Sequence, residues 1–215
     1  MGGQITALKV QKRNPQRVSV YVDGRFALGL AAIAAAHLRV GEFLSDEDIV
    51  RLRQQDGVER AAERGMDLLS YRPRSRAEIA ARLSRKGHDP AAVEVALGRL
   101  GGVGLVDDRE FARYWVENRA QFNPRGKAIL RRELRQKGVD EAIIEDVLSD
   151  YDEEKAASRV AAAAIRRLRG LDAAVFRRKL GDLLRRRGFP YDIIEPLVSQ
   201  AGSEHTFTMT SEEGE

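Results

Sequence analysis

Basic side chains at recurring positions are the residues of this sequence whose types and spacing could do chemistry. They form three clusters about 50 residues apart, and clustered guanidinium and ammonium groups bind phosphates or carboxylates. The candidate contact residues are Arg72, Arg74, Arg76, Arg82, Arg85 and Lys86 in the first cluster, Arg125, Lys127, Arg131, Arg132, Arg135 and Lys137 in the second, and Arg177, Arg178, Arg185 and Arg186 in the third. They predict binding of a polyanion.

A second interpretation of the same residues stays open. Glu78 and Arg82 are four residues apart, as are Glu133 and Lys137. On a helix this spacing forms local ion pairs. Part of the positive charge would then be a solvated helix surface with no binding role.

No catalytic, metal or cofactor site is predicted. His37, His88 and His205 are far apart in the chain, and there is no cysteine. No histidine has the spacing of a metal-ligand set or stands in a Ser-His-Asp context. We therefore expect a protein without enzymatic activity, cofactor or metal.

The elements that must position the basic clusters are helices ended by glycine. Gly87, Gly138 and Gly188 are separated by 51 and 50 residues. In all three cases apolar residues stand eight and four positions before the glycine, and six and ten positions after it. A glycine just after a helix normally supplies the left-handed cap conformation. The period therefore predicts a repeated unit in which two helices meet across a capped turn, and not a phosphate-binding loop.

Start and stop signals divide the chain further. Each repeat is expected to contain three helices, with Ser75, Asp89, Asp107 and Asp140 among the N-caps. The expected parts are a small α+β module at 1–57, three-helix repeats at 58–106, 107–151 and 152–200, and a disordered tail at 201–215. The fold class is mostly α, with the repeats forming an elongated curved array.

The N-terminal module differs from the repeats in its pattern. Alternating apolar residues run on both sides of Asp23-Gly24, which is a strong signal for a β-hairpin with a type I′ turn. An earlier run, 5–10, is expected to add a strand, and 31–38 a helix. Ser45 and Asp48 resemble a capping box that opens a short helix ending near Gln55.

Composition sets broad limits on the class of protein. One third of the 215 residues are charged, and the formal net charge is +4. A basic surface suits polyanionic partners but is common on ordinary soluble proteins. No apolar run reaches membrane length. We expect a soluble, cytoplasmic monomer with no membrane contact.

Several stretches resemble one known family, the RecX family. The first repeat of that family is similar to residues 68–75 (LLSYRPRS) of this chain, together with Glu78, Ile79, Leu83, Lys86 and Gly87. The family's link to its second repeat is similar to residues 104–112. The core of its second repeat is similar to Gly126, Ile129, Glu133, Leu134, Lys137 and Gly138. The resemblance covers most of 58–150, and the third repeat and the N-terminal module fit longer members.

The resemblance implies a modulator, usually an inhibitor, of the recombinase RecA in DNA repair and control of the SOS response. Members of the family lie in the groove of the RecA–DNA filament and bridge its subunits. The expected partners are therefore this filament and, weakly and in a salt-sensitive manner, single- or double-stranded DNA. The family has no catalytic residues to transfer.

Two other classes remain as alternatives. Three-helix units of this size also occur in transcription regulators, which place the last helix of the unit in the major groove of DNA. The expected last helix of the second repeat is acidic, which disfavours that mode. A helical-repeat scaffold for unrelated proteins is the other alternative.

Overall fold

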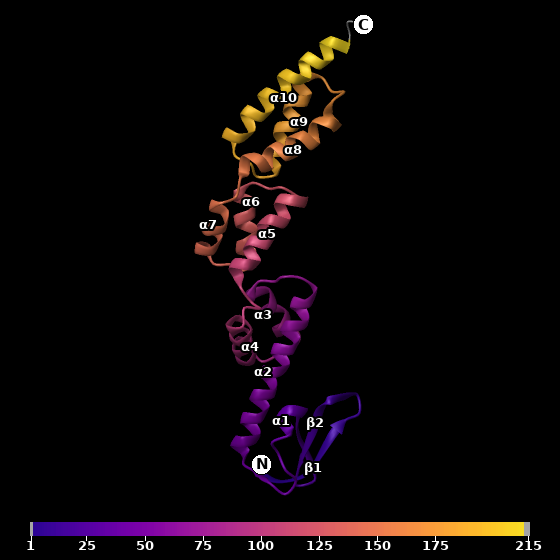
Figure 1. Ribbon diagram of the computed structural model, residues 1–215, viewed down its shortest axis with the longest axis vertical. Coiled ribbons are helices and arrows are strands. Elements are labelled where there is room, and N and C mark those ends of the chain that lie inside the picture. The colour runs from indigo at the N-terminus through magenta and orange to yellow at the C-terminus, as the bar shows by residue number, and fades with distance from the viewer. Residues whose placement is uncertain (1, 213–215) are drawn as a thin grey trace. The chain divides into compact units, whose positions relative to one another are not determined.

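A computed structural model describes residues 2–212, of which 206–212 are described by their backbone alone. The chain divides into two compact units, Met1–Val106 and Asp107–Glu215. Among the described residues, unit 1 holds a β-sheet and the four helices α1–α4, and unit 2 holds the six helices α5–α10 (Figure 1). The predicted mostly helical fold, with three three-helix repeats after a small β-containing module, is confirmed. The curvature of the array stays a prediction.

The N-terminal module is built on a four-stranded antiparallel sheet. Its strands are β1 (Gly3–Gln11), β2 (Asn14–Val22), β3 (Arg25–Ala31) and β4 (Phe43–Leu44), in the order β3-β2-β1-β4. Asp23 and Gly24 have φ angles of 48° and 76°, which a type I′ turn requires at both central residues. The predicted hairpin and the additional first strand are confirmed.

The helix expected after the hairpin is much shorter than predicted. The helix α1 covers only Ala32–Ala35. The chain then turns at Gly41, whose φ is 94°, and Phe43–Leu44 pairs with the start of β1. The need to return to the sheet edge ends the helix early, although the sequence of 31–38 is compatible with a longer one.

The helix α2 (Asp46–Tyr71) corrects a predicted boundary. Its first turn has the expected capping box between Ser45 and Asp48. However, it continues without a break through residue 57, where the sequence predicted the end of the first module. Asp56 lies inside this helix, and its carboxylate pairs with Arg17 of β2 at 2.8 Å. Gly57 lies in the same helix beside Ala92: a Cβ added at Gly57 would be 3.6 Å from the Ala92 Cβ.

Repeat 1 consists of the second half of α2 with α3 (Arg76–Arg85) and α4 (Pro90–Gly102). The side chains of Ser75 and Asp89 cap α3 and α4 as expected. Gly87 has a φ of 82°, so it supplies the left-handed cap. The predicted core residues, Ile79, Leu83, Val93 and Leu97, are buried together.

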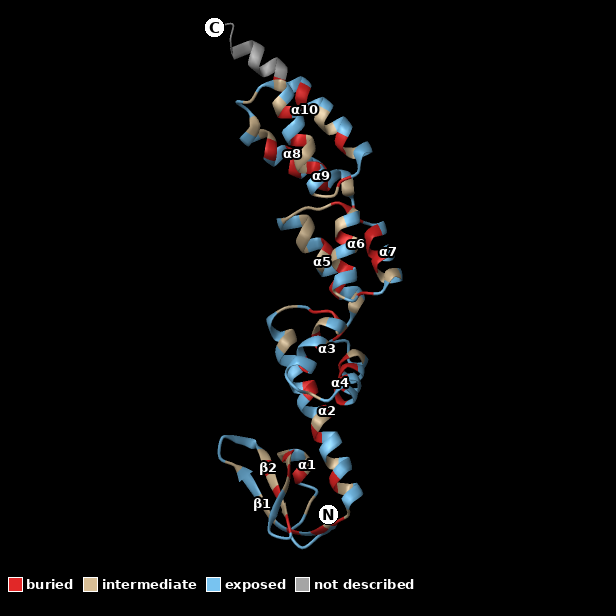
Figure 2. Cartoon of the chain, turned by 180° about the vertical axis from the view of Figure 1, so that it is seen from behind, coloured by how far each residue is buried: buried red, intermediate tan, exposed pale blue. Residues whose placement is uncertain are grey.

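Repeats 2 and 3 share one hydrophobic core inside unit 2. Figure 2 shows the buried residues of both repeats in red. Repeat 2 consists of α5 (Asp108–Phe122), α6 (Lys127–Gln136) and α7 (Glu141–Ser149). Repeat 3 consists of α8 (Glu153–Leu168), α9 (Ala173–Arg186) and α10 (Tyr191–Glu212). Gly138 and Gly188, with φ angles of 74° and 83°, end α6 and α9 in the same way as Gly87 ends α3.

The predicted disordered tail is wrong over 201–205, where α10 continues with buried side chains. For 206–212, where only the backbone of α10 is described, the disorder stays a prediction. Ala201 and His205 are both buried. The His205 ring stacks on Phe176 with a centroid distance of 4.2 Å, and its Nε2 lies 2.8 Å from the carbonyl oxygen of Leu171. These contacts hold the helix on α9, and composition alone gave no sign of them. Residues 213–215 lie outside the described residues.

Candidate nucleic-acid interface

The basic residues of repeat 1 differ in their availability. Arg72 is paired with Glu78, with 3.2 Å between Nη2 and Oε1, and Arg76 is paired with Glu94 of α4. The predicted pairing of Glu78 with Arg82 is therefore replaced by one with Arg72. The proline that ends α2 turns the loop so that Arg72 comes back over the first turn of α3.

Arg74 is buried and does not belong to the candidate interface. Its side chain is 8% exposed, and its Nε donates a hydrogen bond of 2.9 Å to the carbonyl oxygen of Leu68. Burial, followed by the nearby charges of Arg72 and Arg82, lowers the pKa of this guanidinium. The sequence prediction of a partner contact at Arg74 is corrected: the residue fixes the α2–α3 loop.

Two of the predicted contacts in repeat 2 bind an acidic residue of the same repeat. Arg131 and Arg135 of α6 lie 3.2 and 2.5 Å from the carboxylate oxygens of Glu141, which begins α7. The hydrogen bond from Arg135 is the main cause that lowers the pKa of Glu141. Arg132, which is exposed on the same helix, is the available cation of this set.

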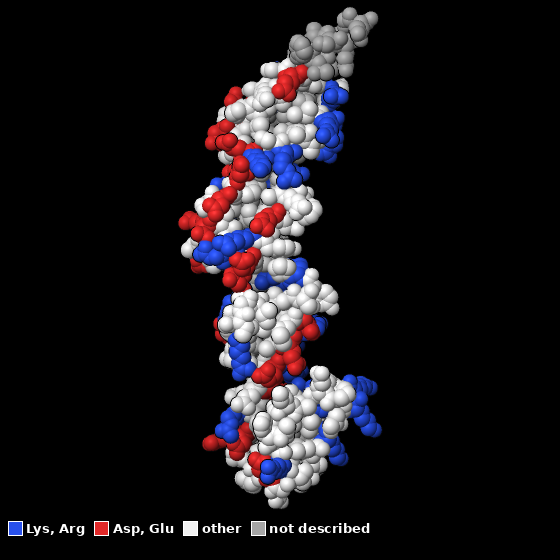
Figure 3. Space-filling model, viewed as in Figure 1, with Lys and Arg blue, Asp and Glu red and all other residues white. Residues whose placement is uncertain are grey.

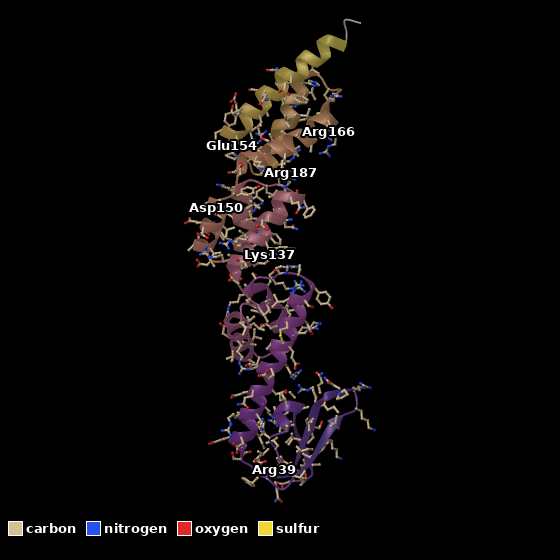
Figure 4. The ribbon with its side chains drawn as sticks, viewed as in Figure 1. Arg39, Lys137, Asp150, Glu154, Arg166 and Arg187 are labelled. Carbon is tan, nitrogen blue, oxygen red and sulfur yellow. The ribbon has the colours of Figure 1, made fainter. Side chains whose placement is uncertain are left out.

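Trp115 organises a second neutralised cluster in repeat 2. The carboxylate of Glu133 accepts hydrogen bonds of 2.8 Å from both the Trp115 Nε1 and the Arg119 Nε. The Arg119 guanidinium lies 4.5 Å and the Lys137 Nζ 5.0 Å from the centre of the indole ring. Lys137 (Figure 4) therefore faces an aromatic ring within its own repeat. Phe111 is buried in the core, and Trp115 is half-buried.

Arg125 and Lys127 lie where repeat 2 meets repeat 3. The Lys127 amide donates to the Glu153 carboxylate at 2.7 Å, and this carboxylate replaces the side-chain cap that Gly126 lacks. A Cβ at Gly126 would lie 1.9 Å from the Gly188 carbonyl oxygen, so only glycine fits. The backbone of both residues is thus part of an internal seam.

A group of arginines gathers at this seam. Arg187 (Figure 4) donates to Asn123 Oδ1 at 2.8 Å and to the carbonyl oxygen of Pro124 at 3.1 Å. Burial, and then the charges of Arg125 and Arg167, lower the pKa of Arg187. Arg187 and Arg167 were not among the sequence-predicted contacts. The hydrogen bonds of Arg187 and its partial burial indicate a role in joining the repeats.

Repeat 3 presents its predicted residues at the surface. Arg177, Arg178, Arg185 and Arg186 of α9 are all exposed, and Arg185 is paired with Asp182. A hollow between α8 and α9 is lined by Arg167, Lys179 and Arg186, together with Asp182. Within unit 2, acidic side chains gather over α7 and basic ones over α8 and α9 (Figure 3).

In repeat 1 the structure brings two first-helix residues, which the sequence analysis missed, to the predicted cluster. Arg64 of α2 lines a groove with Arg82, Arg85 and Lys86. Arg60, one turn before Arg64, lines an adjacent hollow with Arg17 and His88. The four-residue spacing of Arg60 and Arg64 placed them on one helix face, but only the packing of α2 against α3 shows which face it is.

The chain matches four family models in the order in which its parts follow one another. These are the regulatory protein RecX N-terminal domain over residues 3–45, and the first, second and third three-helix domains of RecX over 61–100, 107–148 and 152–198. The regulatory protein RecX of Bacillus licheniformis is 31% identical over 206 residues, which cover 94% of this chain and 78% of the relative. The chain belongs to the RecX family.

Other RecX proteins and solved structures agree with this assignment. The regulatory protein RecX of Mycobacterium sp. (strain KMS) is 40% identical over 140 residues, or 61% of this chain and 76% of the relative. A crystal structure of regulatory protein RecX has a TM-score of 0.71 at 28% identity and covers 90% of this chain and 98% of its own. RecX from Lactobacillus salivarius, at 22% identity and a TM-score of 0.61 over 68% of this chain and 97% of its own, shares the fold.

Two features are absent from the part of the chain that the structure describes. No helix there is both long enough and apolar enough to cross a bilayer. No set of three or more histidine, aspartate or glutamate side chains is arranged to hold a metal ion in the same part of the chain. The candidate interface of this RecX-family chain consists of the cationic surfaces of the two units described above.

Proposed function

We propose that this protein binds the RecA–DNA filament and inhibits RecA recombinase activity, and so acts in DNA repair and in control of the SOS response. The observation that carries the proposal is the match to all four RecX domains in order. The relatives over nearly the whole chain are named regulatory proteins. The proposal requires a cytoplasmic protein, since RecA filaments form on chromosomal DNA.

The shape and the surface charge of the repeats would produce the binding to the filament. The repeats are held by buried apolar side chains, as Ile79 and Leu83 in repeat 1 and Leu130 and Leu134 in repeat 2 illustrate. Exposed cations on the second helices, such as Arg132 and Arg178, are then presented on rigid elements. A rigid cationic surface suits phosphates or an acidic protein groove.

The test is the RecA ATPase rate on single-stranded DNA, together with filament disassembly followed by fluorescence of labelled RecA. The expected result is a lower ATPase rate and faster loss of filament. If neither quantity changes at saturating protein, the proposal is wrong.

A pair of charge variants tests the role of the second helices. Arg132→Glu combined with Arg178→Glu is expected to weaken inhibition. The matched control, Arg25→Glu combined with Arg39→Glu, changes the same charge on exposed residues of the N-terminal module (Arg39 is labelled in Figure 4). Arg131 and Arg135 are left unchanged because they neutralise Glu141.

The alternative is a helical DNA-binding protein or transcription regulator that acts without RecA. The helix α7 would enter the major groove in that mode. It carries Glu141, Glu145 and Asp146 and no lysine or arginine, and phosphates would repel it. Sequence-selective DNA binding combined with unchanged RecA activity would favour this alternative.

A further inference from the structure

The groove between α2 and α3 in repeat 1, named here the α2–α3 groove, has an unusual lining. Leu68 and Leu83 supply its apolar part, and its charged residues are Arg64, Arg82, Arg85 and Lys86. No carboxylate lines it, and no ion pair of Arg82, Arg85 or Lys86 exists among residues 2–205. Four cations thus meet in one hollow that no carboxylate lines, and of the four only Arg64 has an ion pair among residues 2–205, with Asp67 beside the groove.

The equivalent groove of repeat 2 shows what is missing. Counted from the cap glycines Gly87 and Gly138, Arg64 corresponds to Trp115, Arg82 to Glu133, and Lys86 to Lys137. In repeat 2 the indole fills the groove, and the Glu133 carboxylate accepts two hydrogen bonds there. The cations Arg119 and Lys137 lie against the ring. The groove of repeat 2 thus contains its own oxyanion.

Repeat 3 has apolar residues at the same two positions. Counted from Gly188, Ile165 corresponds to Arg64 and Leu183 to Arg82. Both side chains are partly buried against the core of unit 2. Of the three repeats, repeat 1 therefore places two positive charges where the others place an aromatic-carboxylate pair or an apolar pair.

Positive charges gathered in this way repel one another, and the effect reaches neighbouring groups. Arg60 and Arg64, after burial, lower the pKa of His88. Arg72 and Arg82, also after burial, lower the pKa of Arg74. An arrangement that disfavours further positive charge is favourable for an anion, which would remove the repulsion.

We propose that the α2–α3 groove is a phosphate-binding site for a nucleic-acid strand, with Arg64, Arg82, Arg85 and Lys86 as the donors. This site specifies where the proposed function would involve contact with DNA. It rests on the proposed function only because DNA is a component of the RecA filament. In repeat 1 a phosphate takes the place that the Glu133 carboxylate has in repeat 2. Guanidinium groups suit this ligand because their forked N–H donors match the phosphate oxygens.

A strand is favoured over a single acidic side chain because the cations continue beyond the groove. The adjacent hollow shares Arg64 and Lys86 with it and adds Arg17 and Arg60, and the carboxylates of Glu63 and Asp67 also line it. A nucleic-acid strand carries a charge at every phosphate and can follow such a track. Asp67 pairs with Arg64 at 3.0 Å, but both side chains are at least half exposed, so a phosphate can displace this weak pair.

The experiment uses the full chain and fluorescence anisotropy of a labelled oligo-dT, titrated at several salt concentrations. Arg82→Glu places a carboxylate where repeat 2 has Glu133. This variant is expected to bind oligo-dT about tenfold more weakly. The slope of its log binding constant against log salt concentration is expected to be shallower by about one unit. Arg64→Gln combined with Lys86→Gln is expected to act in the same direction without reversing a charge.

The matched control is Arg39→Glu, which changes the net charge as much as Arg82→Glu does but lies in the N-terminal module. It is expected to stay within about twofold of the parent affinity and to keep the salt slope. Circular dichroism and melting temperature check that all variants are folded. Equal losses in Arg82→Glu and Arg39→Glu would overturn the proposal, because they would reflect net charge alone.

Two further outcomes separate this site from the proposed function. If Arg82→Glu binds oligo-dT like the parent but loses binding to DNA-free RecA, the occupant is an acidic protein surface and the phosphate site is wrong. If the parent binds oligo-dT through the α2–α3 groove but leaves RecA activity unchanged, the site stands and the proposed function fails.

Discussion

Equivalent positions of the three repeats share backbone conformation at some sites and differ in side-chain chemistry at others. Gly87, Gly138 and Gly188 do the same work three times, since all have a φ near 80° and allow the chain to leave a helix in the left-handed conformation. Arg82 and Glu133 are also equivalent, yet one leaves a groove positive and the other neutralises it. Backbone requirements are thus repeated, whereas side-chain chemistry diverges.

A matched pair of glycine substitutions tests the cap. Gly87→Ala is expected to destabilise the protein by about 1 kcal/mol, because a Cβ disfavours positive φ. Gly98→Ala in the exposed middle of α4 is expected to stabilise it by about 0.5 kcal/mol. A Cβ would meet no atom within 4 Å at either site, so the difference comes from the backbone. Urea unfolding measures both, and equal effects would contradict the cap assignment.

His88 reports on the charge around the α2–α3 groove. Its pKa is lowered by burial and by Arg60 and Arg64. Because the unfolded chain binds the proton more readily, the contribution of His88 to stability is present above about pH 6.5 and is lost as the pH falls from there to the lowered pKa.

An NMR titration of the His88 ring measures this pKa directly. The pKa is expected to be below the ordinary value in the free protein and to rise when oligo-dT is added, since bound phosphates offset the positive charges. Binding would then take up protons, and affinity would increase as the pH falls through this range. The ring resonances of His37, which is exposed in the N-terminal module, are the internal reference for the effect of adding oligo-dT.

At the scale of helices, the grooves of the repeats differ in which side chains the first and second helices place in them. In repeat 2, α5 contributes Trp115 and Arg119, and α6 contributes Glu133. The carboxylate links the two helices through two hydrogen bonds, one of them to a charged donor. Such a bond contributes more to stability than one between neutral groups.

Removal of that charge tests the link. Glu133→Gln is expected to lower the free energy of unfolding by about 1.5 kcal/mol and to shift the fluorescence of Trp115, the only tryptophan in the chain. Glu117→Gln, on the exposed side of α5, is the control and is expected to change neither. An unchanged stability in Glu133→Gln would show that the indole fills the groove without needing the carboxylate.

At the scale of the molecule, the chain consists of two compact units that meet at Val106 and Asp107 in the sequence. Each has its own buried clusters: the sheet module and repeat 1 in unit 1, and the joint core of repeats 2 and 3 in unit 2. Units with separate cores can fold separately.

Separate expression of residues 1–106 and 107–215 tests this organisation. Both fragments are expected to give dispersed amide NMR spectra and cooperative unfolding, because no core cluster is divided by the cut. An unfolded 107–215 fragment would show that its core needs unit 1. A cut at 151, through the core that repeats 2 and 3 share, is the control and is expected to give unfolded or aggregated fragments.

The sequence by itself determined the local structure with good accuracy where a strong signal needs no distant partner. Ser75, Asp89 and Asp140 cap their helices, Asp23-Gly24 forms the hairpin turn, and the three glycines have positive φ. Each of these choices depends on one or two backbone angles or on a side chain that reaches its own helix. The apolar spacing around the glycines likewise gave the core of every repeat.

Tertiary structure decided the rest, because those features depend on residues far apart in the chain. Asp56 pairs with Arg17 inside α2, at a place where the sequence predicted a break between two helices. His205 stacks on Phe176 in α10, at a place where composition predicted disorder. The availability of each arginine was decided in the same way. Residue type shows that a side chain is charged, but only its neighbours in space determine whether that charge is buried, neutralised or left for a ligand.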